Sequence, residues 1–397
     1  MTRLAGYASG RSHIYAVDLV RVLTFASVIA VHTVVTVNPP ESIPANGAAM
    51  LLHFTREAFF ALTAFVLMYR YRDGLRVAPF WWHRFLLVGA PYVGWSVIYS
   101  GLTLIAAPQP PGATFLGALA QLGHNLLTGT AWYHLYFLVV TMQFYLLFPL
   151  FRRLLQAAER WWGGHYWLLG SSAALQIGID AGLHLGHPHG SAARLVGYAG
   201  SFVGSYVFYL VLGGLAALHA ERVQAKVRKH PVPVLVAVVL TGTAAQGWYL
   251  HAVHGGSSPG YASEVFQPVM VPWCIAVIAA LFTLGVTWAA RRGAGPGSRV
   301  VEISSERSFG VFLIHPMVLW AVTLGPSAWL STKVSALCST VVAFVATIVV
   351  SLLVVEVLRY SPLCLVLTGK RRAPRGRALI ARETLRRGLR PDAAPGT

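Results

Sequence analysis

Long apolar segments are the feature that most limits how this chain can fold. Only 11% of its 397 residues are charged, against about 25% in an ordinary soluble domain. About 20 apolar residues in a helix cross the roughly 30 Å hydrocarbon core of a bilayer. The sequence therefore predicts an all-α, polytopic membrane protein with about ten transmembrane helices. The expected spans are about 14–37, 46–69, 85–107, 132–150, 166–180, 198–219, 232–251, 268–290, 308–325 and 333–356.

The basic residues predict how these helices are oriented. Of the 31 Lys and Arg residues, 27 lie in the N-terminal segment, in alternate loops and in the C-terminal segment, and only Arg194 and Lys333 lie in the loops between them. Because cytoplasmic loops carry the excess of Lys and Arg, both termini are expected in the cytoplasm. We expect a multi-pass protein of the plasma (inner) membrane, with residues 1–358 as its membrane domain.

The high net charge of +18 is interpreted as a rim that faces the cytoplasm and attracts anionic membrane lipid. No nucleic-acid-binding signature accompanies the charge, so no nucleic-acid partner is expected. Residues 359–397 are predicted to form a basic cytoplasmic tail. Either a basic helix lying on the membrane surface or a disordered segment fits this composition.

The first apolar segment contains Asp18, Arg21 and His32. A charged side chain at the centre of a membrane helix costs about 2.5–3.5 kcal/mol on insertion scales, so such residues are usually functional. Arg21 and His32 are eleven positions apart, which places them on one helix face and about 16 Å apart along the axis. Arg21 is expected in the cytoplasmic half and His32 in the outer half. Asp18 and Arg21 can instead form a structural pair, because residues i and i+3 are neighbours.

Further polar residues fall within the apolar segments. Histidine has the side chain best suited to proton transfer near neutral pH, which makes His134 and His315 candidates. His134 can also sit at a membrane interface without a function, and His315 can simply hydrogen-bond a carbonyl freed by the next residue, Pro316. Arg56 and Glu57 are adjacent, and adjacent residues on a helix are not expected to face each other. Each is therefore expected to need another partner and to be a candidate for tying helices together.

A histidine-rich stretch is the one candidate for a metal site. It contains His184, His187 and His189. Tetrahedral zinc sites take four ligands, and no fourth ligand accompanies these three. We therefore expect no metal site.

Five short motifs follow one another within about residues 14–360. They are Arg21 with His32; Phe59-Phe60-Ala-Leu-Thr63-Ala64-Phe65; Trp81-Trp82-His83-Arg84 with Pro91; His134-Leu-Tyr136-Phe-Leu138 with Tyr145-Leu-Leu-Phe-Pro149; and Gly310-Val-Phe312-Leu-Ile-His315-Pro316. In this order they resemble the motifs of the acyltransferase-3 family of integral membrane O-acyltransferases. Thr63-Ala64 departs from the family's Ser-Gly, and the chain looks closest to the branch that acylates exported polysaccharides or glycolipids.

This resemblance implies a reaction and a set of roles. The implied reaction moves an acyl group from cytoplasmic acyl-CoA, with acetyl-CoA as the default, to a hydroxyl of an exported sugar, polysaccharide or glycolipid. Acyl-CoA is then a co-substrate, and no permanently bound cofactor is expected. The implied catalytic residues are His32 and Arg21, the implied CoA-binding residues are Arg84 and Arg72, and the implied acceptor-binding residues are His134, Tyr136, His315 and Glu57.

Two other functions stay open from the sequence. Transporters and flippases also use buried His, Arg and Asp in proton relays, so a glycan or lipid transporter without acyl chemistry is the main alternative. A structural subunit of a cell-envelope export complex is the other, and export machinery is also an expected partner of an acyltransferase of this kind.

Overall fold

The computed structural model describes residues 13–106, 114–161, 163–186, 190–324, 335–370 and 372, and in these residues the secondary structure is entirely helical. Eight of the spans described are long and apolar enough to cross a membrane on their own, which confirms an all-α, polytopic membrane protein. These spans are α1 (Tyr15–Val37), α2 (Ile43–Leu52) with α3 (Phe54–Tyr71), α4 (Val77–Ala106), α6 (Tyr136–Ala158), α11 (Pro231–His254), α13 (Met270–Arg291), α14 (Pro296–Leu324) and α16 (Ala336–Leu358).

The two remaining predicted spans are helical but differ from the others. The span predicted at 198–219 contains two short 3-10 turns, η1 (Ala199–Ser201) and η2 (Val203–Tyr206), followed by α9 (Val207–Leu218). It passes the same length and apolarity criteria only together with α10 (Ala220–Lys229), which turns away at 94°. The span predicted at 166–180 is α7 (Gly164–Leu185), which is 22 residues long but less apolar. Length and composition thus support eight spans, or nine with the bent pair, in the described residues.

Three boundaries differ from the predicted ones for physical reasons. The second span is broken at His53, where α2 ends and α3 begins. The fourth starts at Tyr136 rather than 132, because residues 129–135 form turns. The ninth is much longer than 308–325, since charged residues that interrupt its apolar pattern continue the helix and pair with neighbouring helices. Arg292, just after α13, pairs with Glu302, and Arg307 pairs with Glu356 of α16 at 2.7 Å.

Four short helices complete the described structure: α5 (Phe115–Thr128), α8 (Gly190–Gly197), α12 (Pro259–Ala262) and α17 (Cys364–Thr368). The last of these packs against α4 and α14. The indole Nε1 of Trp95 donates a hydrogen bond to the Leu367 carbonyl at 3.1 Å. Helix α17 thus lies against the bundle, and residues 371 and 373–397 of the predicted basic tail lie outside the described residues.

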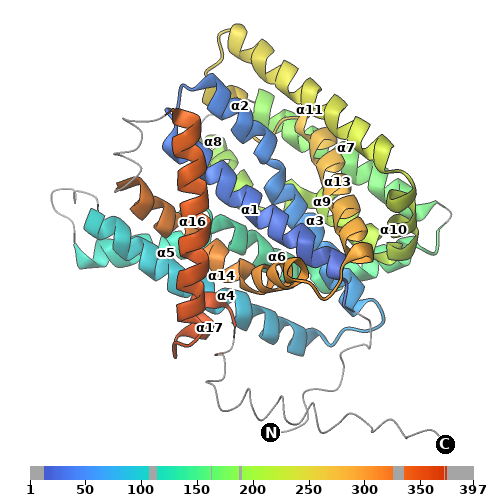
Figure 1. Ribbon diagram of the computed structural model, residues 1–397, viewed down its shortest axis with the longest axis horizontal. Coiled ribbons are helices and arrows are strands. Elements are labelled where there is room, and N and C mark those ends of the chain that lie inside the picture. The colour runs from blue at the N-terminus through green and yellow to red at the C-terminus, as the bar shows by residue number, and fades with distance from the viewer. Residues whose placement is uncertain are drawn as a thin grey trace, which may run out of the picture.

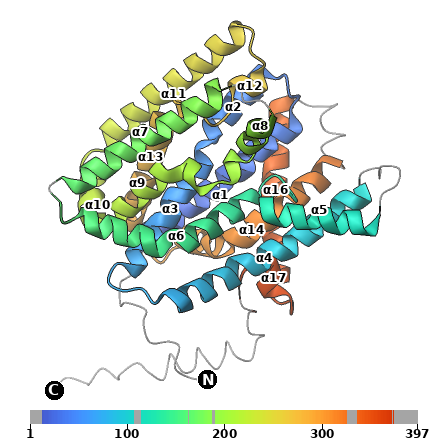
Figure 2. The same ribbon diagram turned by 180° about the vertical axis from the view of Figure 1, so that it is seen from behind.

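Helix α1 lies inside the bundle, packed against α3, α13, α14 and α16 (Figure 1). From both sides of the molecule, α5 and α11 lie at opposite edges (Figures 1 and 2).

Two glycines permit the closest helix crossings. A Cβ on Gly285 of α13 would lie 2.6 Å from the Ala16 carbonyl oxygen of α1, and one on Gly213 of α9 would lie 1.9 Å from the Ala61 carbonyl oxygen of α3. These backbones approach so closely that a larger residue would push the helices apart.

Candidate active site

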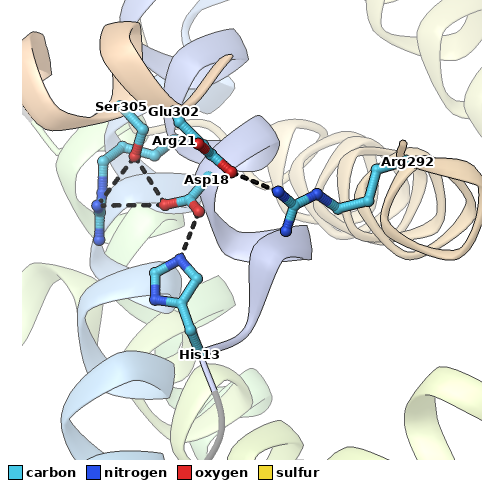
Figure 3. Close-up of polar contacts among 6 residues, drawn as sticks. All are labelled: His13, Asp18, Arg21, Arg292, Glu302 and Ser305. Atoms are coloured by element: carbon cyan, nitrogen blue, oxygen red, sulfur yellow. Dashed lines mark hydrogen bonds and ion pairs between the residues drawn. The ribbon is translucent and has the colours of Figure 1, made fainter. Parts of the chain in front are cut away.

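Arg21 is held at one end of α1 by a polar network that reaches α14 (Figure 3). Its Nη1 donates to the Ser305 hydroxyl at 3.2 Å, and that hydroxyl donates to Asp18 Oδ1 at 2.8 Å. His13 Nε2 contacts the other carboxylate oxygen of Asp18 at 2.5 Å, and the direct Arg21–Asp18 separation is 3.9 Å. The Asp18–Arg21 pair foreseen as a structural alternative therefore exists, with Ser305 bridging it. About a third of the Arg21 side chain (32%) remains exposed.

A second contact set fixes the same end of the bundle. Arg292 pairs with Glu302 (Figure 3) and lies over the Tyr15 ring, with its guanidinium carbon 3.4 Å from the ring centroid. This cation–π contact and ion pair join the end of α13 and the start of α14 to the first residue of α1. The predicted cytoplasmic ends of these three helices are thus tied together around Arg21.

Arg84 lies within electrostatic range of Arg21. The guanidinium carbon of Arg84 is 5.7 Å from the Tyr145 ring centroid. Both arginines act electrostatically on Tyr145 and on each other. Lys370, next to α17, is also within electrostatic range of Arg21. Three cationic groups therefore gather at this end of the bundle, where an anion can be bound.

Arg72 occupies a different place. Its Nη1 donates to the Leu218 carbonyl at 3.1 Å, at the end of α9. Its own carbonyl accepts hydrogen bonds from Arg152 Nη2 and Gln156 Nε2, both at 2.9 Å. These contacts join α3, α6 and α9, and none of them connects Arg72 to the Arg21 and Arg84 group. A role for Arg72 in donor binding stays a prediction.

Three histidines from distant parts of the chain meet toward the other end of α1. The ring centroid of His315 in α14 is 5.5 Å from that of His32 in α1 and 5.5 Å from that of His134, just before α6. Tyr133 completes the group, with its ring centroid 4.5 Å from that of His32. His134 and His315 are fully buried or nearly so, whereas His32 is partly exposed.

The hydrogen bond of His315 determines where its proton lies. Pro316 has no N–H, so the Phe312 carbonyl one turn earlier has no helical partner. His315 Nδ1 is 2.7 Å from that carbonyl oxygen, which can only accept a hydrogen bond. Nδ1 therefore carries the proton, and in the neutral ring the lone pair is on Nε2. Nε2 is buried without a hydrogen-bond partner, so satisfying the freed carbonyl leaves His315 with a basic nitrogen in the cluster.

A ring of four phenylalanines separates the two polar groups. Phe25 of α1 contacts Phe59 of α3 at 4.9 Å between centroids, and Phe59 contacts Phe137 of α6 at 4.5 Å. Phe137 contacts Phe312 of α14 at 5.4 Å, and Phe312 contacts Phe25 at 5.8 Å, which closes the ring. Phe25 lies one turn after Arg21 on the helix that carries His32. Arg21 and His32 therefore lie on opposite sides of an apolar layer.

A cavity of about 280 Å³ lies beside the histidines. Tyr133 lines this cavity and also contacts His32, so the cavity adjoins the histidine cluster. Tyr136, a predicted acceptor-binding residue, lines it too. The lining residues are Arg56, Gly129, Thr130, Trp132, Tyr133, Tyr136, Gly197, Tyr198, Gly200 and Ser201. Non-helical backbone at 129–135 forms one wall, as expected where irregular backbone borders a cavity within a membrane protein.

These clusters and the motifs along the chain agree with a comparison to known families. A family model described as an acyltransferase domain matches residues 14–356. The chain belongs to the acyltransferase-3 family. No curated protein and no solved structure shows significant similarity to it. The match starts just before α1 and ends within α16, so Arg21, Arg84, the three histidines and the phenylalanine ring of this membrane acyltransferase lie inside the family domain.

Glu57 of this acyltransferase does not line the cavity. Its Oε1 lies 3.7 Å from Arg56 Nη2, so the expectation that these adjacent residues do not face each other was wrong. Long side chains bend back along the helix and meet although their Cβ atoms diverge. Oε2 has no hydrogen-bond partner, and Glu57 acts electrostatically on Asp180 and Cys274, in α7 and α13. Its predicted role in acceptor binding therefore has no support from cavity contact.

The histidine-rich stretch is only partly described. The ring of His184 stacks on Tyr261 at 5.3 Å between centroids, whereas His187 and His189 lie outside the described residues. Within the residues that the structure describes, no three His, Cys, Asp or Glu side chains gather as a metal site would require.

Three features of the acyltransferase were not predicted from its sequence: the contacts of Ser305, the phenylalanine ring and the place of Arg56 in the cavity. Phe59, Phe137 and Phe312 belong to the motifs, which was a usable signal for the ring. Ser305 and Arg56 belong to no motif, and only helix packing reveals their partners.

Proposed function

We propose that this acyltransferase moves an acyl group, acetyl by default, from acyl-CoA on the cytoplasmic side to a hydroxyl of an exported sugar, polysaccharide or glycolipid. The observation that carries the proposal is the arrangement along α1. A cationic group around Arg21 and Arg84 lies on one side of the phenylalanine ring, and three histidines lie on the other. An anionic donor and a hydroxyl acceptor need these two environments, and one helix connects them.

The donor is bound at the cationic end. CoA carries phosphate groups, and arginine guanidinium groups recognise phosphate through paired hydrogen bonds. Arg84 contacts the phosphates, and Arg21, positioned by Ser305 and Asp18, orients the donor. Arg72 can add a further contact at the same side of the membrane. The thioester has to pass the phenylalanine ring to reach His32, and the narrow pantetheine arm is the part of the donor that fits such a passage.

The chemistry takes place at the histidine cluster. His32 accepts the proton of the acceptor hydroxyl as its oxygen attacks the thioester carbonyl carbon. The tetrahedral intermediate collapses, the carbon–sulfur bond breaks, and an ester forms on the acceptor. The CoA thiolate leaves and takes up the proton from His32, so atoms and charge balance. His134 and His315 shape the acceptor side, and the free Nε2 of His315 is a second proton acceptor next to His32.

We place this reaction in the plasma (inner) membrane, with the acceptor reaching the outer side through cell-envelope export machinery. The excess of basic residues at one end of the bundle supports this orientation. In the described part of the outer loops, Arg194 of α8 is the basic residue, and it is exposed.

The test is acyl-CoA-dependent thiol release by the purified protein. Acetyl-CoA and other short acyl-CoAs are supplied, and donor binding and free CoA thiol are measured for wild type and His32→Ala. Saturable binding, with thiol release lost in His32→Ala, supports the transferase. His251→Ala is the matched control, because His251 is exposed on α11 at the edge of the bundle. Absence of both binding and release with every donor would favour the transporter instead.

A further inference from the structure

Arg56 is the one charged residue among those that line the cavity beside the histidines. Its Nη1 donates to the Tyr136 hydroxyl at 3.4 Å, while Nε and Nη2 are buried and have no hydrogen-bond partner. Buried N–H groups without acceptors carry a desolvation cost, and this cost is recovered when a ligand supplies oxygen atoms. Arg56 is therefore a cation at the cavity wall with two N–H groups that no protein acceptor satisfies.

The surroundings hold Arg56 in position. Its guanidinium carbon lies 5.0 Å from the Phe266 ring centroid, and Glu57 Oε1 lies 3.7 Å from Nη2 without a hydrogen bond. Glu57, which does not line the cavity, balances part of the positive charge of Arg56. Only 19% of the Arg56 side chain is exposed. A guanidinium fixed in this way places a positive charge at the cavity wall, and guanidinium groups favour the oxygens of a carboxylate or phosphate.

The rest of the cavity suits a sugar. Four aromatic residues, Trp132, Tyr133, Tyr136 and Tyr198, contribute to its lining, with glycine, Thr130 and Ser201 between them. Aromatic rings offer apolar faces, and tyrosine adds a hydroxyl for hydrogen bonding, which suits a pyranose with its apolar face and polar rim. Tyr133 lines the cavity and contacts His32, so the cavity adjoins the proposed base through this residue.

We infer that this cavity binds an acidic sugar unit of the acceptor, with a carboxylate or phosphate oxyanion on Arg56 and the sugar ring against the aromatic wall. The acceptor class is then an anionic glycan or glycolipid. The role of this cavity as an acceptor site rests on the proposed function. Binding of an acidic sugar to the cavity can be tested without any acyl-CoA.

The test measures binding of three small probes to His32→Ala protein in the absence of acyl-CoA. The probes are methyl glucuronide, glucose 6-phosphate and methyl glucoside. They share a glucose-type ring and supply a carboxylate, a phosphate or no charge. We expect at least one anionic probe to bind ten times more tightly than methyl glucoside. Which of the two binds distinguishes a uronic acid from a sugar phosphate.

Variants of Arg56 identify the anchor. In the same His32→Ala background, Arg56→Gln is expected to weaken binding of the anionic probe at least tenfold. Binding of methyl glucoside is expected to stay nearly unchanged. Arg56→Lys is expected to retain part of the preference, because lysine keeps the positive charge but lacks the planar guanidinium. Arg194→Gln is the matched control, since Arg194 lies on the same predicted side and outside the cavity lining.

Three results would each overturn the inference. They are equal binding of the three probes, no binding of any of them, and an anionic preference that survives in Arg56→Gln. The comparison of probes on protein with Arg56 intact needs no Arg56 variant, so it decides the matter even if Arg56→Gln fails to fold. Failure of thiol release would remove the proposed function while leaving an Arg56-dependent binding site in place, so the two failures are distinguishable.

Discussion

Arg21 and Ser305, 284 positions apart, are joined by a 3.2 Å hydrogen bond that ties α1 to α14. The same hydroxyl donates to Asp18 at 2.8 Å, so one serine sets the position of both charged residues. In a protein that binds an anionic donor with Arg21, this bond controls the direction in which the guanidinium points. It is therefore a suitable first target for a test.

Replacing Ser305 by Ala should weaken donor binding more than the chemical step. The change removes one acceptor from Arg21 and one donor from Asp18, and a hydrogen bond to a charged group contributes about 1.5–3 kcal/mol. We expect the KM for acetyl-CoA to rise about tenfold, with kcat changed much less, in the thiol-release assay. Ser304→Ala is the control from the same helix. A fall in kcat with KM unaltered would show that Ser305 does not position the donor site.

The phenylalanine ring should determine which acyl chains pass. Phe25→Leu replaces one phenylalanine of the ring with a smaller apolar side chain. The proposed passage for the donor through the ring then widens, at a moderate cost in stability. We expect the ratio of kcat/KM for hexanoyl-CoA to that for acetyl-CoA to rise several-fold. The control is Phe144→Leu, which changes a buried phenylalanine of α6 that is not in the ring. An unchanged chain-length ratio would mean that the ring does not limit passage.

Pro316→Ala should separate activity from stability. Alanine restores the N–H that can bond the Phe312 carbonyl, so the helix gains a backbone hydrogen bond and His315 Nδ1 loses its acceptor. We expect the melting temperature to hold or rise while His32-dependent thiol release falls at least tenfold. Pro91→Ala in α4 is the comparison, since it also removes a proline from inside a spanning helix. Full activity in Pro316→Ala would show that the orientation of His315 is not needed.

Acidification should loosen the junction between α7 and α9. His219 lies just after α9, and its Nε2 is 2.9 Å from His165 Nδ1. Burial, followed by the neighbouring His165, lowers the pKa of His219 below its usual 6.5. The other charged groups around it are Arg222, Glu159 and Arg72. The unfolded chain then binds a proton more readily than the folded protein, so His219 contributes stability above about pH 6.5 that is lost as the pH falls toward its folded pKa.

The measurement is the melting temperature in detergent at pH 7.5 and pH 5.5. Wild type should lose more stability on acidification than His219→Gln, because glutamine does not titrate. His230→Gln serves as the control, since His230 is an exposed histidine at the far end of α10. Identical pH dependence of wild type and His219→Gln would contradict this assignment.

Much of the architecture followed from local properties of the sequence. A helix that crosses a bilayer has to be long and apolar, so the spanning segments could be recognised without knowing how they pack. The shared face of Arg21 and His32 follows from helix periodicity alone. Errors arose where local rules compete with long-range contacts. The charged start of α14 was left out because its apolar pattern stops, yet ion pairs to α13 and α16 keep it helical.

The sequence by itself determined the fold class and the likeness to the acyltransferase-3 family, which the family match then showed. It also placed Arg21 and His32 on one helix. The tertiary structure alone decided what surrounds them. His134 and His315 meet His32, Ser305 meets Arg21, and Arg56 enters a cavity with Tyr136 because helices far apart in the chain pack side by side. Periodicity shows which face of a helix is polar. The partner of that face depends on close contacts such as Gly285 against Ala16 and on turns such as 129–135, which are set by the packing of the whole bundle.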